Sequence, residues 1–477
     1  MELKNMKKII AISALSIFLV GLVSCEKETD LYQSIKTEDA YKTVLDVDNG
    51  INGAYYALGS YRLLGMNVPA LGDMATDVSK ADASSGHFVT INKYTANQYS
   101  GELNEIWLYG YKVIDRCVRA TNGAELLLET TTNEDDMATL YKSLSQAYSL
   151  RALTNFYLVN IFGLPYQPGV QNTQKGIILL ENAPIEPFAT VSRSSVEATY
   201  AQILSQIQKA KDYYTLYDNA GGKSLSAFYM GEGAIYALEA RVKLYMHDWN
   251  GALIAAQTAI DIKGPKAVSN DIYQTMWRSI AITDEDIFTI AKSDNDNLSA
   301  NSLNTLYGSY KGQISAFTKS LLDATDIRKA LIATFTSANQ PAKFQGTSTS
   351  QATSNIPIFR VSEMYLIIAE GTAQLNVDLD AAKDALLFTA QRNTAITTTA
   401  DLPATQADLL TFIAKENVRE FFAEGHRWFD LRRTGNTFLF GGKVFDVAKF
   451  VFPIPDAEVA SGAGVEQNDN WFVAIPK

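Results

Sequence analysis

The stretch GAIYALEARVKLYMHDWNGALIAAQTAIDIKGP, residues 233–265, predicts two helices joined by a short polar turn. Small apolar residues recur at helical spacing on both sides of a turn at residues 247–250: Ala237, Ala240, Val242 and Leu244 before it, and Ala252, Ala256, Ala259 and Ile260 after it. A glycine and a proline at positions 264 and 265 end the second helix. Because small residues let two helices approach closely, this stretch predicts a tightly packed helix pair.

A second stretch, residues 360–393, repeats this arrangement, and Asp378 can cap its second helix. Two helices around residues 107–118 and 147–156 form a third, more diverged unit. In the first pair, the alanine spacing and the proline that follows it resemble the tetratricopeptide pattern, although Pro265 lies one position late. Stacked pairs bury faces that one pair cannot bury alone, so we expect a mainly α scaffold.

Long segments rich in Gly, Ser, Thr, Asn and Pro separate these units, at residues 65–100, 162–194, 294–312, 334–357 and 435–455. We predict loops and small β-hairpins there. Exposed aromatic rings in such loops can stack on the apolar C–H face of a sugar. We therefore predict ligand contacts from five aromatic residues, namely Phe88, Tyr94, Tyr99, Tyr307 and Tyr310. The alternative for each ring is a half-buried staple that holds its loop.

The N-terminus predicts export. Three lysines precede an apolar run from residue 9 to 23, which is shorter than the roughly 20 residues that span a membrane and is typical of a cleaved signal. The run ends in Leu-Val-Ser before Cys25, which resembles the bacterial lipobox, where the cysteine is acylated. We predict a lipoprotein signal peptide at 1–24, lipid attachment at Cys25, and a polar leash to residue 45; the alternative for Cys25 is an ordinary thiol.

Composition narrows the classes of function. A formal net charge of −11 disfavours nucleic acid as a ligand, because proteins bind it mainly through basic side chains. Cys117 is the one other cysteine, so we expect it to be a small buried apolar residue. We find no zinc or nucleophile motif among the usual patterns and predict no catalytic residue, cofactor or metal ligand. Residues 294–297 lack the glycine and glutamate of an EF-hand, although a looser structural calcium site stays open.

The densest charged stretch is KENVREFFAEGHRWFDLRRTG, residues 415–435. Glu416, Glu420 and Glu424 share one helix face, as a carboxylate metal site would require. Four arginines, at 419, 427, 432 and 433, are interleaved with them, so we predict a buried ion-pair network instead. A glycosidase with two acids elsewhere in the chain stays open, because such acids share no fixed spacing.

GHRWFDLRRTG, residues 425–435, resembles the C-terminal signature of the SusD/RagB family of surface lipoproteins. Other blocks agree in order, including Gly72-Asp73 with Asp77, AYSLRALTNFYLVNIF at 147–162 and RVSEMYLIIAE at 360–370. The resemblance implies one SusD-like domain over residues 46–477, with an N-terminal part to about 265 and a C-terminal part from about 266. It also implies about four tetratricopeptide-like pairs in a right-handed superhelical scaffold, with long loops and small hairpins on one side.

Proteins of this kind are lipid-anchored at the cell surface in the outer membrane. They are not enzymes, and they pass captured nutrient, most often a glycan, to a SusC-like TonB-dependent β-barrel transporter. The resemblance therefore implies glycan capture for transport. The alternatives are a peptide-capturing lid on such a transporter, a surface-anchored glycan hydrolase, and a protein-binding helical scaffold.

Overall fold

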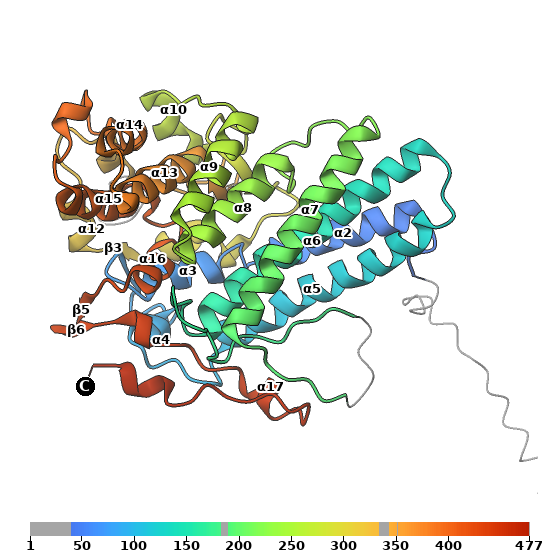
Figure 1. Cartoon of the computed structure of the whole chain (residues 1–477). Helices are drawn as coiled ribbons and strands as arrows, with labels where there is room; N and C mark the ends of the chain where they lie inside the picture. The colour runs from blue at the N-terminus through green and yellow to red at the C-terminus, as the bar shows by residue number, and fades with distance from the viewer. Residues whose placement is uncertain (1–39, 183–188, 333–342, 351, 477) are drawn as a thin grey trace, which may run out of the picture. The chain divides into compact units, whose positions relative to one another are not determined.

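The computed structural model describes residues 40–182, 189–332, 343–350 and 352–476 (Figure 1). Residues from Tyr41 to Lys477 form one compact unit. The predicted signal peptide, Cys25 and the leash up to residue 39 lie outside the described residues. Within the described ranges, no helix combines the length and apolar character needed to cross a membrane.

Long helices pack as sequential neighbours and form most of the unit (Figure 1). They are α2 (Val44–Leu58), α5 (Gly101–Leu128), α6 (Glu134–Phe162), α7 (Val196–Asn219), α8 (Glu232–Tyr245), α9 (Trp249–Lys263), α13 (Val361–Leu375), α14 (Leu379–Ala390) and α15 (Gln406–Phe421). The predicted pairs are confirmed: α5 packs on α6, α8 on α9, and α13 on α14. Helix α13 also packs on α9, which joins two pairs into one scaffold.

Helix ends follow the expected chemistry. Asp378 caps α14 by accepting a hydrogen bond from the Ala381 N–H at 2.9 Å. Asp248 caps α9 in the same way, so the turn after α8 is shorter than predicted and α9 begins at Trp249. Gly264 ends α9 with a φ of 101°, a conformation that favours glycine. Cys117 is fully buried, as predicted, and burial raises the pKa of its thiol to about 12.

Shorter helices and strands cover the long helices. The short helices are α3 (Asn67–Met74), α4 (Val89–Asn92), α10 (Asn270–Thr275), α11 (Leu303–Tyr307), α12 (Ala316–Ser320), α16 (Arg427–Thr434) and α17 (Asp456–Val459). The strands are β1 (Ser79–Lys80), β2 (Asp286–Ile290), β3 (Gln313–Ile314), β4 (Ile356–Arg360), β5 (Phe438–Phe440) and β6 (Lys443–Phe445). All three described ladders, β1–β3, β2–β4 and β5–β6, are antiparallel.

Two loop predictions need correction. Residues 67–74, expected to be loop, form the wholly buried helix α3. Gly72 of this helix and Gly425 of the turn that follows α15 let the two backbones touch. We predicted small hairpins in the long loop segments, but β5–β6 is the one described ladder that joins strands adjacent in the sequence. The other two ladders join segments far apart in the chain, which local patterns do not reveal.

A buried ion-pair network is present, as predicted, and centres on Glu420, but the arginines beside this carboxylate come from distant segments. Among the described ion pairs, Arg419 is the one of the four interleaved arginines that contacts any of the three glutamates, at 2.6 Å from Glu416. This carboxylate is fully buried and lies 2.9 Å from Arg360 Nη1 and 3.1 Å from Arg328 Nη1. Burial alone would raise its pKa, but the surrounding arginines hold the pKa of Glu420 well below its usual range. Arg432 departs from the prediction, because it donates to the backbone carbonyls of Asn160 and Gly163 rather than to a carboxylate.

Candidate functional site

The two-residue ladder β1–β3 brings two of the aromatic loop segments together. Ser79 pairs with Ile314 and Lys80 with Gln313. At one end of this ladder the His87 ring stacks on Tyr310, with ring centres 3.8 Å apart and planes 11° apart. Segments 65–100 and 294–312, each predicted to carry ligand-binding aromatics, are therefore neighbours in space.

The five aromatic residues predicted to contact ligand differ in how far their rings are buried. Phe88, Tyr94 and Tyr307 are 1%, 4% and 1% exposed, so these three rings belong to the core. Tyr307 hydrogen-bonds Ser79 at 3.1 Å, and Tyr94 donates to the Ala75 carbonyl. For these three the staple alternative holds, because a ring packed on all sides offers no face to a sugar. Tyr99 is 71% exposed and Tyr310 half-buried, and ligand contact by these two stays a prediction.

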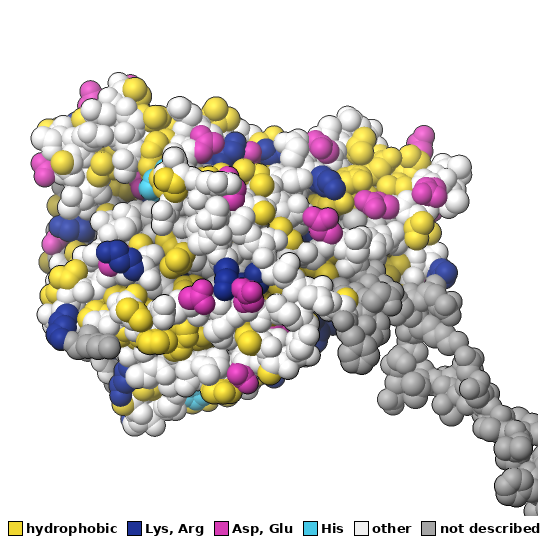
Figure 2. All heavy atoms as spheres, turned by 60° about the horizontal axis from the view of Figure 1, so that its bottom comes forward, with side chains coloured by type: hydrophobic (Ala, Val, Ile, Leu, Met, Phe, Trp, Pro, Cys, Tyr) yellow, Lys and Arg dark blue, Asp and Glu magenta, His cyan; other side chains and the backbone are white. Residues whose placement is uncertain are grey.

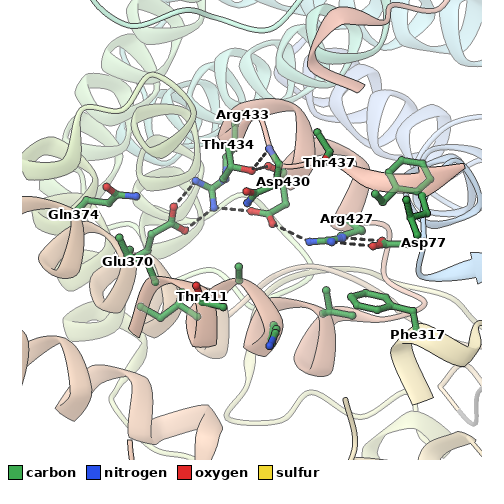
Figure 3. A pocket seen from close by; sticks show the side chains of 18 residues that line it. Asp77, Phe317, Glu370, Gln374, Thr411, Arg427, Asp430, Arg433, Thr434 and Thr437 are labelled. Carbon is green, nitrogen blue, oxygen red and sulfur yellow. Dashed lines mark hydrogen bonds and ion pairs between the residues drawn. The ribbon is translucent and has the colours of Figure 1, made fainter. Parts of the chain in front are cut away.

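A cleft of about 660 Å³ opens beyond the other end of the ladder, between α12, α13, α15, α16 and the β5–β6 hairpin (Figure 3). A row of charged side chains of alternating sign crosses it, from Glu370 through Arg433, Asp430 and Arg427 to Asp77. The three central residues are spaced three apart on α16, so they share one face of that helix. Helix α13 supplies one end of the row and the segment before β1 the other.

Each charge in this row is paired with the next. Arg433 Nη1 donates to Glu370 Oε1 at 2.7 Å, and Arg433 Nη2 donates to Asp430 Oδ1 at 2.6 Å. Arg427 donates through Nε and Nη2 to the two oxygens of Asp77 at 2.9 and 3.0 Å, and its Nη1 lies 3.7 Å from Asp430 Oδ2. Burial opposes the charged form of both arginines, but the neighbouring carboxylates raise the pKa of each.

Neutral polar and apolar side chains surround this row. Gln374, Thr411, Asn436 and Thr437 supply amide and hydroxyl groups, and all four are exposed. Phe317 is 36% exposed and lies at the Asp77 end, whereas Gln374 lies at the Glu370 end (Figure 3). A cavity of this volume with apolar surface and a few polar groups suits an extended small ligand such as a segment of a carbohydrate chain.

The described residues offer no group of three or more His, Cys, Asp or Glu side chains arranged to hold a metal ion. Asp294, from the segment considered for calcium, accepts hydrogen bonds from Thr349 and Thr353 at 3.2 Å each. Asp296 pairs with Lys292 at 3.0 Å. A structural calcium ion stays a prediction.

Sequence reasoning missed several cleft residues. Asp77 and the α16 residues entered the sequence analysis as parts of a family resemblance, and Arg427 and Arg433 as members of a buried ion-pair network, not as ligand-binding residues. The spacing of three between Arg427, Asp430 and Arg433 was the available signal that they share a face. Phe317 and Gln374 carry no local signal, because the elements that place them in the cleft come from distant parts of the chain.

Two family models match this chain. The model described as "SusD family" matches residues 328–471, and the model described as "Starch-binding associating with outer membrane" matches residues 30–244. Together they include the α5–α6 pair, the α13–α14 pair and the α16 segment of the cleft. A curated relative, SusD-like protein P2 of Formosa agariphila, is 25% identical over 203 residues, which is 41% of this chain and 36% of that relative's length.

Solved structures share the fold. A SusD superfamily protein from Bacteroides vulgatus is 25% identical with a TM-score of 0.78, covering 91% of this chain and 100% of that one. A SusD-like carbohydrate binding protein from the same species is 20% identical with a TM-score of 0.69, covering 83% and 84%. The family matches, the mostly helical architecture and these structural neighbours agree, and the chain belongs to the SusD-like family.

Proposed function

We propose that this chain is a non-catalytic glycan-binding lipoprotein of the outer membrane, which captures an oligosaccharide or polysaccharide segment in the α16 cleft. The observation that carries the proposal is the cleft itself, where hydrogen-bonding side chains and the exposed Phe317 line one cavity of about 660 Å³. The matched family description of starch binding at the outer membrane and a carbohydrate-binding structural neighbour support it.

Binding is favoured over hydrolysis by the state of the cleft carboxylates. A glycosidase needs one carboxylic acid that can donate a proton and a second carboxylate across the scissile bond. Asp77, Glu370 and Asp430 each accept hydrogen bonds from an arginine, at 2.9, 2.7 and 2.6 Å. All three carboxylates are therefore engaged by guanidinium groups within the row, and none is left free to face a scissile bond as the acid of such a pair.

Delivery to a SusC-like TonB-dependent transporter, with anchorage through lipid on Cys25, completes the proposal. Cys25 would hold the compact unit at the membrane by a leash, which leaves the unit free to meet a membrane partner. Purification of the full chain from its native membrane, with and without Cys25→Ala, tests this step. We expect a β-barrel transporter to copurify with the unaltered chain. An unaltered chain whose Cys25 carries no acyl chain by mass spectrometry, with Cys25→Ala as the unlipidated standard, would contradict the anchor.

Glycan capture is tested on native gels that contain a panel of polysaccharides, with reducing ends assayed in parallel. The compact unit from Tyr41 to Lys477 should be retarded by at least one glycan without releasing product. Phe317→Ala combined with Gln374→Ala should abolish the retardation. Asp380→Asn, at a 91% exposed site on α14, is the control and should not change it. Product release would show a hydrolase, and retardation by peptides alone would show a peptide-capturing lid.

A further inference from the structure

We propose that the α16 cleft selects uncharged glycan segments and discriminates against segments that carry carboxylate or sulfate groups. This inference rests on the proposed function and specifies its ligand class. Its basis is the pairing in the cleft, because both arginines of the row already donate to carboxylates within it.

A sugar hydroxyl matches a row of alternating charges. It donates one hydrogen bond and accepts two, so it can lie between a carboxylate and a guanidinium without displacing either. Neighbouring hydroxyls on a sugar ring can repeat this contact along the row from Glu370 to Asp77 (Figure 3). The neutral rim groups Gln374, Asn436 and Thr437 have the same combination of donors and acceptors.

An anionic group does not match this row. It accepts hydrogen bonds only, and it would meet the three carboxylates of Asp77, Glu370 and Asp430 beside guanidinium groups that are already occupied. Like charges placed side by side in an interface suppress binding. Lys415 is the remaining cation in the lining, and its side chain is exposed at the rim, where solvent screens it.

The charge of the whole chain acts in the same direction. The formal net charge is −11, which lowers the local concentration of a polyanion. On the face shown in Figure 2, Lys and Arg side chains are interspersed with Asp and Glu rather than gathered into one basic patch.

The test compares matched glycans. The compact unit from Tyr41 to Lys477 is titrated against an array of neutral plant, algal and microbial polysaccharides, each beside its carboxymethylated derivative. We expect a neutral glycan to bind and its derivative to bind at least about tenfold weaker at low salt. Equal or tighter binding of the derivative would overturn the selectivity and leave glycan capture standing. Binding to no glycan of either kind would overturn glycan capture and the inference with it.

A substitution tests the cause. Asp77→Asn keeps the size of the side chain and removes the carboxylate that accepts two hydrogen bonds from Arg427, which leaves Asp430 at 3.7 Å as the remaining carboxylate in the described ion pairs of that guanidinium. Affinity for the carboxymethylated glycan should therefore rise toward that for the neutral one. Asp115→Asn is the matched control, because Asp115 pairs with Arg119 on α5 and takes no part in lining the cleft. An unchanged preference in a folded Asp77→Asn would contradict the pairing argument, and the comparison of matched glycans on the unaltered chain stands if that variant does not fold.

Discussion

Asp73, on α3, is a buried carboxyl close to the cleft. Both of its carboxyl oxygens are buried without a hydrogen-bond donor, although the backbone N–H groups of Ala423 and Gly425 lie near them. Burial raises the pKa of Asp73 to about 7, and the nearby Lys343 only partly opposes this. In the unfolded chain the same carboxyl titrates at its ordinary value of about 3.9.

The stability contribution of Asp73 therefore falls as pH rises. Between about pH 4 and pH 7 the folded state holds a proton that the unfolded state releases, so each pH unit lowers the free energy of unfolding by about 1.4 kcal/mol. Asp73→Asn removes this dependence. We expect the free energy of unfolding of the variant, minus that of the unaltered chain, to increase with pH across this window and level off above it.

Urea unfolding from pH 4.5 to 8 measures that difference. The buried His426, whose pKa is lowered to about 3 mainly by burial, titrates in both proteins, so its opposite contribution cancels. A difference that does not change with pH would show that Asp73 is ionised throughout, with donors that the described contacts do not include.

Glu420 pairs with three arginines in the buried ion-pair network. Glu420→Gln would leave the arginines at 328, 360 and 392 buried with too little negative charge. Loss of one partner from a buried pair costs about 3–5 kcal/mol, so we expect a decrease of that size in the free energy of unfolding. Asp380→Asn, which alters an exposed pair on α14, should change it by less than about 0.5 kcal/mol. Equal effects in chemical denaturation would contradict the network's role.

At the scale of elements, α3 holds the turn between α15 and α16 by direct backbone contact. A Cβ atom on Gly72 would overlap the carbonyl oxygen of Gly425, and one on Gly425 would overlap the backbone of Pro69. This contact sets where α16 begins, and with it the position of the charged row. Asp430 accepts a hydrogen bond from Arg433 on the same helix. A shift of α16 would therefore move these charged residues together.

Gly72→Ala should separate α3 from that turn. We expect a loss of about 1–3 kcal/mol in the free energy of unfolding, together with weaker glycan binding. Gly101→Ala is the matched control, because a Cβ there meets open space at the start of α5 and alanine favours helix. Thermal unfolding and the gel assay on both variants check this, and normal stability of Gly72→Ala would show that the contact relaxes without cost.

The elements also show what sequence could and could not predict. Helix pairs such as α8–α9 were predictable because alanine spacing, an Asp cap and a Gly-Pro stop are all local. The burial of Tyr94 was not, because its ring packs on Phe445 and Phe450, with ring centres 4.6 and 5.0 Å away, from a distant segment. Helix α3 was mistaken for loop because its proline and glycine are typical of turns, whereas here glycine serves a close approach.

At the scale of the whole molecule, the α8–α9 pair and the cleft have separate roles. The α8–α9 pair packs on α13 and supports it, while α13, α16 and the β5–β6 hairpin present groups that line the cleft. Ligand should therefore change the dynamics of the cleft elements and leave most of the scaffold unchanged.

Hydrogen exchange with and without the retarding glycan tests directly whether the α16 cleft binds glycan. We predict protection in peptides from α16 and the β5–β6 hairpin, with α8–α9 unaffected. Protection confined to α8–α9 would contradict glycan binding in the α16 cleft.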